Sequence, residues 1–325
     1  MLDFAVNVRA AAPPSWLTER LAARLGDLAR YPSAADESAA RQAVAARHGR
    51  RPEEVLLLAG VAEGFALLAQ LRPRLAALIA PSFTEPEALF DAAGVPTAQV
   101  VLAPPFALAG AEVPAQIPGQ AEVVVVGNPT NPTGVLHTRE QVLALRAPGR
   151  LVVVDEAFMD SVPGEPQSLA GDGRFDDVLV LRSLTKTWSL AGLRVGYALG
   201  APEVLARLAA GRAHWPLGTL QLEAITACST PGAVAQAARG ASELAGLRAQ
   251  MAAALSSAGF PVTDGAAPFV LFGVPDADLA RKRLAEKGIA VRRGDTFYGL
   301  DGQYLRAAVR AEWPQLVAAL QEVTW

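Results

Sequence analysis

The chain has 325 residues, 51% hydrophobic and 19% charged, which predicts a compact globule of about two domains rather than a disordered chain. A formal net charge of −3 provides no basic field for nucleic acid or an anionic membrane, and no apolar run reaches the roughly 18 residues of a membrane span. The single cysteine, Cys228, excludes an internal disulfide framework, and three scattered histidines provide no metal-ligand spacing. The first residues lack the pattern of a secretion signal, which favours a cytoplasmic protein.

Short β-branched runs alternate with alanine- and leucine-rich helical segments up to about residue 200. This alternation predicts an α/β fold, with a mainly parallel central sheet covered by helices on both faces. The expected strands are Val55–Leu58, Leu78–Ala80, Val100–Leu102, Val123–Val126, Leu151–Val154, Val178–Leu181 and Val195–Leu199, and the expected helices include Ala62–Leu71, Glu85–Ala93 and Arg139–Arg146.

From about residue 202 the pattern changes to long alanine-rich helices, which continue through Ser257. Beyond them the pattern indicates a smaller α+β domain, completed by the first thirty residues of the chain. Its expected elements are strands at Phe269–Gly273, Ile289–Arg292 and Tyr304–Val309, a helix near Asp276–Lys287 and a C-terminal helix. The predicted division is an N-terminal segment at 1–30, a large domain at 31–230 and a small domain at 231–325.

Polar residues follow three of the expected strands. In VVVVGNPTNPTGVL (123–136), two Asn-Pro steps hold asparagine side chains in a rigid turn, although an ordinary strand-to-helix turn has the same pattern. In LVVVDEAF (151–158), Asp155 follows four apolar residues, where a carboxylate is costly unless paired, although a helix cap would also place an aspartate there. The stretch VLVLRSLTK (178–186) ends with Lys186, one of three lysines in the chain, among hydroxyls. Because functional groups gather at the carboxyl ends of parallel strands, we expect these residues to meet.

Taken together, these groups have the chemistry that pyridoxal 5′-phosphate requires. A lysine amine in a site of low polarity forms a Schiff base with an aldehyde, and a carboxylate such as Asp155 pairs with a ring nitrogen. Hydroxyls and an arginine hold a phosphate, and AGVAEGF (59–65) adds backbone amides at a helix N-terminus. The sequence therefore predicts a cofactor site and no metal site.

The motifs NPTNPTG, DEAF and SLTK, with Arg194 eight residues after the lysine, resemble the signature of fold-type I enzymes of the class I/II aminotransferase family. The resemblance covers nearly the whole chain, including RYP at 30–32, PSF at 81–83 and YLRAAVR at 304–310. It implies the PLP-dependent transferase (aspartate aminotransferase-like) fold, with pyridoxal 5′-phosphate bound by the large domain. It also implies an active enzyme that forms a homodimer with shared active sites.

The resemblance implies roles for individual residues around the cofactor. Lys186 would bind the cofactor covalently and move protons, Asp155 would pair with the pyridine nitrogen, and Asn131 would hydrogen-bond the ring hydroxyl. Phe83 would stack on the ring, and Phe158 would lie beside it. The phosphate would be held by Gly60, Val61, Ala62, Ser183, Thr185 and Arg194, with Tyr31 reaching the phosphate of the neighbouring subunit.

Substrate contacts are expected from both ends of the chain. Arg306 matches the arginine that clamps a substrate carboxylate, although a surface arginine on an edge strand is the alternative. Asn7 occupies the place of an asparagine near the substrate, and one of Arg292 and Arg293 is expected to meet a substrate anion. The expected substrate is a small amino acid or amine phosphate.

Two subgroups of the family that handle phosphorylated substrates fit this sequence. Phe158, where many aminotransferases have tyrosine, and RRGDTFYGLDGQYLRAAVR (292–310) resemble the threonine-phosphate decarboxylases of cobalamin biosynthesis, which is the main prediction. The alternative is a histidinol-phosphate aminotransferase, favoured by AGVAEGF and by a start at LDF without the extension typical of the decarboxylases. A catalytically silent binding or regulatory module is disfavoured, because Lys186 and Asp155 are both retained.

Overall fold

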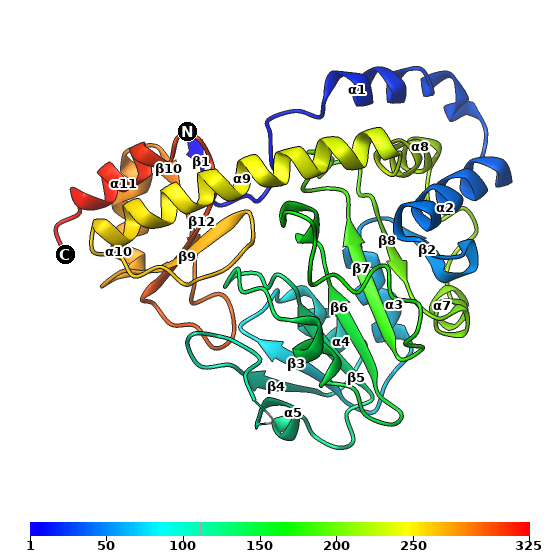
Figure 1. The fold of residues 1–325 in the computed structure, drawn as a ribbon, viewed down its shortest axis with the longest axis horizontal. Coiled ribbons are helices and arrows are strands. Elements are labelled where there is room, and N and C mark those ends of the chain that lie inside the picture. Colours follow the sequence, from blue (N-terminus) through cyan, green and yellow to red (C-terminus); the bar gives the residue numbers. More distant parts are fainter. Residues whose placement is uncertain (111) are drawn as a thin grey trace.

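The structure is a computed structural model that describes residues 1–110 and 112–325. Within these residues, a seven-stranded sheet in the order β2-β8-β7-β6-β5-β3-β4 forms the centre of the larger part (Figure 1). Neighbouring strands are parallel except that β8 runs antiparallel to both β2 and β7, so the expected mainly parallel sheet is confirmed. The strands are β2 (Val55–Leu58), β3 (Ala76–Ala80), β4 (Thr97–Val101), β5 (Val123–Gly127), β6 (Leu151–Asp155), β7 (Val178–Ser183) and β8 (Gly196–Leu199).

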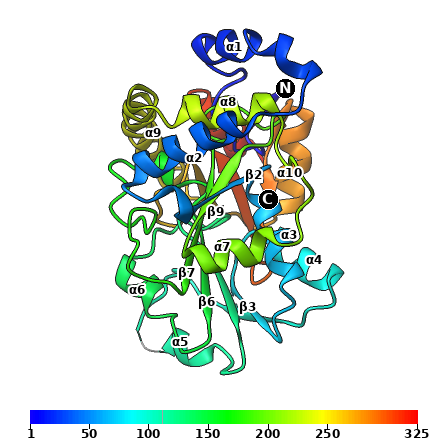
Figure 2. The ribbon, with the colours of Figure 1, turned by 90° about the vertical axis from the view of Figure 1, so that its right-hand side faces the viewer.

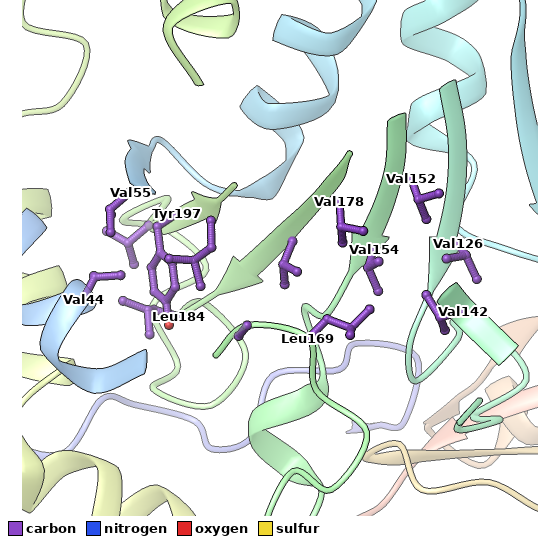
Figure 3. Close-up of a cluster of buried hydrophobic side chains, with 14 of the residues drawn as sticks. Val44, Val55, Val126, Val142, Val152, Val154, Leu169, Val178, Leu184 and Tyr197 are labelled. Carbon is purple, nitrogen blue, oxygen red and sulfur yellow. The ribbon is translucent and has the colours of Figure 1, made fainter. Parts of the chain in front are cut away.

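Helices cover both faces of this sheet because side chains on its strands alternate between two hydrophobic cores. In β6, Val153 faces one core, with α3 (Val61–Gln70), α4 (Glu85–Ala92) and α7 (Pro202–Ala209). Val152 and Val154 face the other, with α2 (Ala34–His48), α6 (Arg139–Leu143), α8 (Thr219–Cys228) and the short α5 (Glu112–Gln116) (Figure 3). Figure 2 shows α3 and α4 on one side of the sheet and α6 on the other.

Two small sheets and three helices enclose a separate core that includes Phe4, Phe272 and Leu305. The antiparallel sheet has the order β11-β12-β9, and β1 pairs with β10 in parallel. The predicted domain boundaries stay a prediction. The elements are β1 (Leu2–Asp3), β9 (Phe269–Gly273), β10 (Ile289–Ala290), β11 (Arg292–Arg293), β12 (Tyr304–Ala308), α9 (Pro231–Ser257), α10 (Ala277–Glu286) and α11 (Trp313–Gln321).

The expected strand Ile289–Arg292 was wrong in extent, because the chain changes partner at Val291. Ile289 pairs with Leu2 of β1, whereas Arg292 pairs with Arg306 of β12. A continuous β-branched run carries no signal for such a change of partner, which depends on the strands that the fold brings alongside.

The N-terminal segment serves both parts of the molecule. Phe4 is fully buried in the small core, and the N–H of Ala308 donates to its carbonyl at 2.7 Å. The N–H of Arg9 then donates to the carbonyl of Lys186 at 3.1 Å, and α1 (Ser15–Ala22) packs on α8. Of the first thirty residues, therefore, the beginning joins the small sheets and α1 joins the large part. The long helix α9 also runs between the two parts (Figure 1).

Helix α2 was not among the expected elements, although its sequence carries boundary signals. The Ser33 hydroxyl accepts from the N–H of Asp36, and the Asp36 carboxylate accepts from the N–H of Ser33, which completes a capping box. Gly49 ends the helix with φ of 63°, a left-handed conformation that glycine adopts readily. Among the described residues, no helix combines the length and the apolar character needed to cross a membrane.

A cluster of buried charges lies beneath β6 and β7. Arg182 is about 1% exposed, and its Nη1 donates to Glu156 Oε2 at 2.9 Å and to Glu165 Oε2 at 2.7 Å. Asp160 accepts from Arg182 and also from Arg47 of α2, at 2.8 Å in the second case. Because each charge has a partner of opposite sign, the cluster links α2, β7 and the loop after β6 into one unit.

Replacing Arg182 with methionine is expected to lower the free energy of unfolding of the cofactor-free protein by about 3–5 kcal/mol, because Glu156 and Asp160 lose a buried partner. Urea unfolding followed by circular dichroism measures this change. The matched control is Arg283→Met, which breaks an exposed pair with Glu286 and is expected to change stability by less than about 1 kcal/mol. If the two substitutions lowered the free energy of unfolding equally, Arg182 would not be the stabilising partner of Glu156 and Asp160.

Candidate active site

A cavity of about 330 Å³ lies at the carboxyl ends of β5, β6 and β7, where strand β12 of the small sheet and the N-terminal segment close over it. Most of the residues that the sequence singled out lie together there, although they come from segments far apart in the chain. Those lining the cavity are Asn7, Val61, Ala62, Phe83, Asn131, Asp155, Phe158, Ser183, Thr185, Lys186, Arg194 and Arg306, joined by Ala5, Val6, Glu85 and Ala157.

One end of the cavity is a cup built from the N-terminus of α3 and the loop after β7. The hydroxyls of Ser183 and Thr185 are hydrogen-bonded to each other at 2.7 Å, and Arg194 lies across the loop at Gly60. Gly60 has φ of 86°, a conformation that favours glycine, and a Cβ there would lie 2.9 Å from Nη2 of Arg194, so a larger residue would displace this guanidinium. Backbone amides at a helix N-terminus, two hydroxyls and a guanidinium form a donor set that fits a phosphate group.

Asp155 and Lys186 form the middle of the cavity. Asp155 ends β6, and its Oδ1 accepts from the N–H of Ala157 at 3.0 Å. Burial raises the pKa of Asp155 to about 6, against the opposing effects of the Ala157 N–H and of Lys186. Burial also lowers the pKa of Lys186, and the positive charges of Arg194 and Arg306 lower it further. The amine is therefore neutral in a larger fraction of molecules at neutral pH than an exposed lysine would be.

The neighbouring carboxylate, Glu156, does not line the cavity. Its side chain accepts from Arg182, from the Ser168 hydroxyl at 2.6 Å and from the N–H of Leu169 at 2.7 Å. Of the two acids in DEAF, therefore, the first belongs to the cavity and the second to the buried charge cluster.

Arg306 reaches the cavity from β12 of the small sheet. Its Nη1 donates to Asn131 Oδ1 at 2.7 Å, Nη2 donates to the carbonyl of Ala5, and the guanidinium lies 5.1 Å from the ring centroid of Phe269. Burial lowers the pKa of Arg306 to about 9, and the positive charge of Arg292 lowers it further in the same direction. With this pKa, the Arg306 side chain is still cationic at neutral pH. At 5% exposed, Arg306 is not the surface arginine that was the alternative interpretation.

Three of the side chains predicted to belong to the site do not line this cavity. Arg292 is exposed above Phe297, with 5.4 Å between its guanidinium carbon and the ring centroid, and Arg293 is paired with Asp295. Tyr31 is 75% exposed and stacks on Trp215, with 4.4 Å between ring centroids. The roles assigned to Arg292, Arg293 and Tyr31 therefore stay predictions.

Sequence reasoning missed the contributions of Ala5, Val6, Ala157 and Glu85 to the cavity wall. The two small residues and Val6 carry no chemical signal. Glu85 follows the PSF motif by two residues, but an acid at the start of a predicted helix is equally typical of a helix N-terminus.

The fold and this site define an enzyme of the pyridoxal phosphate-dependent aminotransferase type. The sequence matches the family "Aminotransferase class I and II" over residues 1–320, and the chain belongs to this family. The predicted family, fold and cofactor are thereby confirmed, and the cofactor is pyridoxal 5′-phosphate.

Relatives come from both predicted subgroups. A histidinol-phosphate aminotransferase of Mycobacterium tuberculosis is 65% identical over 322 residues, which cover 99% of this chain and 87% of that protein. A threonine-phosphate decarboxylase of Salmonella typhimurium is 29% identical over 335 residues, which cover 99% of this chain and 91% of that protein. The solved structure of the histidinol-phosphate aminotransferase from Clostridium acetobutylicum has a TM-score of 0.91 at 21% identity and covers 99% of both chains, which supports the fold. The alternative subgroup is thus better supported than the main prediction.

The environment of Asp155 makes the stability of the cofactor-free protein depend on pH. Its carboxyl has a pKa of about 6 when folded and roughly 3.9 when unfolded, so between these values the folded state holds a proton that the unfolded state has released. This contribution to the free energy of unfolding is complete at low pH and is lost as the pH rises through 6. Asp155→Asn is therefore expected to stabilise the cofactor-free protein at pH 7.5 by up to about 3 kcal/mol, and by much less at pH 4.

Thermal and urea unfolding at the two pH values measure this difference. The control is Asp91→Asn, at an exposed position of α4, which is expected to change stability by at most about 0.5 kcal/mol at either pH. If Asp155→Asn stabilised the protein equally at both pH values, the pKa of Asp155 would not be raised in the folded state.

Proposed function

We propose that this protein is a histidinol-phosphate aminotransferase, which transfers the amino group of histidinol phosphate to a 2-oxo acid. The observation that carries the proposal is the number of guanidinium groups facing the cavity. Among the described lining residues, Arg306 is the one arginine outside the phosphate cup. Histidinol phosphate has a single anionic group, the phosphate, whereas O-phosphothreonine has both a carboxylate and a phosphate. One guanidinium matches the first substrate better, and the similarity to the mycobacterial relative supports the same choice.

The cofactor would be held by the residues that surround the cavity. Asn131 would donate from its amide nitrogen to the ring hydroxyl, because its oxygen already accepts from Arg306. Asp155 would hold the proton on the ring nitrogen, with Phe83 and Phe158 beside the ring. The bound cofactor supplies an electron sink for the bonds of the substrate α-carbon. Its phosphate would lie in the cup formed by Val61, Ala62, Ser183, Thr185 and Arg194.

Lys186 is the group suited to move the proton at the substrate α-carbon. Its amine lies in the cavity with Asp155, and its lowered pKa allows Nζ to accept a proton near neutral pH and return it. Arg194 and Arg306 oppose its protonation by charge, so they favour the state of the amine that accepts the proton.

Arg306 would position the substrate by its anion. Two of its N–H groups bind Asn131 and Ala5, which orients the planar guanidinium, and its other donors remain for a phosphate oxygen. Because Arg306 comes from the small sheet and Asn131 from the loop after β5, this contact also connects the two parts of the molecule around the substrate.

Threonine-phosphate decarboxylation is the second candidate, and Phe158 is the observation that favours it. Phe158 is buried and packs edge-on against Phe269, with 5.0 Å between ring centroids, so it offers no hydroxyl to the cofactor ring. Phenylalanine at this position resembles the decarboxylases, and the relative from Salmonella typhimurium covers nearly the whole chain.

We also propose that the active unit is a homodimer with shared sites. Large hydrophobic side chains are exposed near the N-terminal helices, at Leu25, Leu28, Tyr31 and Trp215. Solvent-exposed apolar groups of this size, gathered in one region, suit a partner surface. Packing against a second copy would cover them and would allow Tyr31 to reach the phosphate cup of the partner.

Product analysis separates the two reactions. With pyridoxal phosphate present, histidinol phosphate and 2-oxoglutarate are expected to yield glutamate, whereas O-phosphothreonine alone is expected to release no CO2. Arg306→Lys should lower kcat/KM for histidinol phosphate roughly 10- to 100-fold, because a lysine cannot replace the planar set of donors. The exposed Arg283→Lys is the control and should leave the rate unchanged. CO2 release that is independent of a 2-oxo acid would identify the decarboxylase instead.

Subunit mixing tests the shared sites. Lys186→Ala should abolish activity and the visible absorbance band of the bound cofactor, and Tyr31→Ala should weaken cofactor binding. If Tyr31 serves the partner's site, unfolding and refolding the two variants together should restore about a quarter of wild-type sites, since each mixed dimer contains one intact site. If mixing restores no activity although size-exclusion chromatography shows dimers, Tyr31 does not act across the interface.

A further inference from the structure

Glu85 lies at the rim of the cavity and has no role in the function proposed above. It is the first residue of α4 and follows Phe83 by two residues, and it is an exposed residue that lines the cavity. Among the described residues, Glu85 forms no ion pair, so its carboxylate is free to bind a group that enters from solvent.

Of the described charged residues that line the cavity, Glu85 is the one without a role in the proposed function. The described lining has three cationic residues, Lys186, Arg194 and Arg306, and two acidic ones, Asp155 and Glu85. In the proposed function, Lys186, Asp155 and Arg194 serve the cofactor, and Arg306 serves the substrate anion. Glu85 is then the one charged residue of the described lining to which the proposed function assigns no partner.

Stabilisation of α4 does not by itself explain a carboxylate at this position. An acidic side chain in the first turn of a helix is favoured by the helix dipole, by roughly 0.3–1 kcal/mol. Glu87 lies in the same first turn and contributes the same effect, but it does not line the cavity. The two residues therefore differ in their access to the substrate and not in their relation to the helix.

We propose that Glu85 is a specificity-determining residue that binds a cationic or N–H donor group at the far end of the substrate. This inference rests on the proposed function and identifies the imidazole of histidinol phosphate as that group. A carboxylate accepts a charge-assisted hydrogen bond from an imidazole N–H, and the bond strengthens when the ring is protonated.

The arrangement gives the cavity two poles of opposite charge. Arg306 presents a cation from β12, and Glu85 presents an anion from α4, so the poles come from different parts of the fold. A substrate with an anion at one end and a donor at the other satisfies both. A substrate with a second anion in place of the donor meets a like charge at Glu85, which lowers its affinity.

The experiment compares L-histidinol phosphate with L-phenylalaninol phosphate, which has the same amine and phosphate but no ring N–H. The wild-type protein loaded with pyridoxal phosphate is expected to prefer histidinol phosphate in kcat/KM by about tenfold or more. Glu85→Gln should raise KM for histidinol phosphate about tenfold while kcat changes little, because a binding contact and not the proton transfer is lost. The same variant should leave phenylalaninol phosphate unaffected, and the matched control Glu87→Gln should behave as wild type.

A binding readout separates this inference from the proposed function. Rapid mixing of each phosphate with the cofactor-loaded protein, followed by visible absorbance, yields a dissociation constant from the first phase, before the α-proton is removed. If wild type binds histidinol phosphate more tightly than phenylalaninol phosphate but forms no glutamate, the proposed reaction fails and Glu85 is still tested by the loss of that preference in Glu85→Gln. A wild-type protein with no preference between the two ligands would overturn the inference, as would a Glu85→Gln variant that weakens both equally.

Discussion

The register of three parallel strands is the constraint on which the site depends. Gly127 of β5, Asp155 of β6 and Leu181 of β7 lie side by side, so the residues that follow each strand emerge at the same edge of the sheet. This register brings the turn with Asn131, the carboxylate of Asp155 and the loop with Lys186 together, although the chain separates them by several dozen residues. Because the side chains of a strand alternate, a shift of one residue in β6 would place Glu156 in the cavity and Asp155 in the charge cluster.

Burying these charges requires compensation, and the molecule supplies it differently on the two sides of β6. Glu156 is neutralised within the structure by Arg182, which belongs to a cluster of buried ion pairs. Asp155 has the N–H of Ala157 but no ion pair of comparable quality among the described residues, and its pKa is raised accordingly. In the proposed function this carboxyl pairs with a cationic ring nitrogen, and that partner would offset the cost of its burial.

Arg306, the residue proposed to hold the substrate anion, lies on β12 of the small core. The position of the small core relative to the large sheet therefore affects the site. Arg306 extends from β12 to Asn131, and the segment from Phe4 to Arg9 runs from the small core to the carbonyl of Lys186. In the proposed function, the position of the small sheets therefore determines where Arg306 holds the substrate anion relative to the cofactor. The orientation of the bond that breaks at the α-carbon depends on this position and not on residue identity alone.

Sequence determined the strands of the large sheet and the cofactor chemistry, because both depend on local patterns. Continuous apolar runs predicted β5, β6 and β7, and the polar residues at their ends predicted the anion cup and the Lys186–Asp155 pair. Strand partners and the burial of individual side chains were decided by the tertiary structure, because sequence periodicity does not specify them. The change of partner at Val291, the burial of Arg306 against Asn131 and the exposure of Arg292 all depend on which segments come together in space. The access of Glu85 to the cavity, in contrast to Glu87, was decided in the same way, because two acids in one helical turn differ only in what lies beside them.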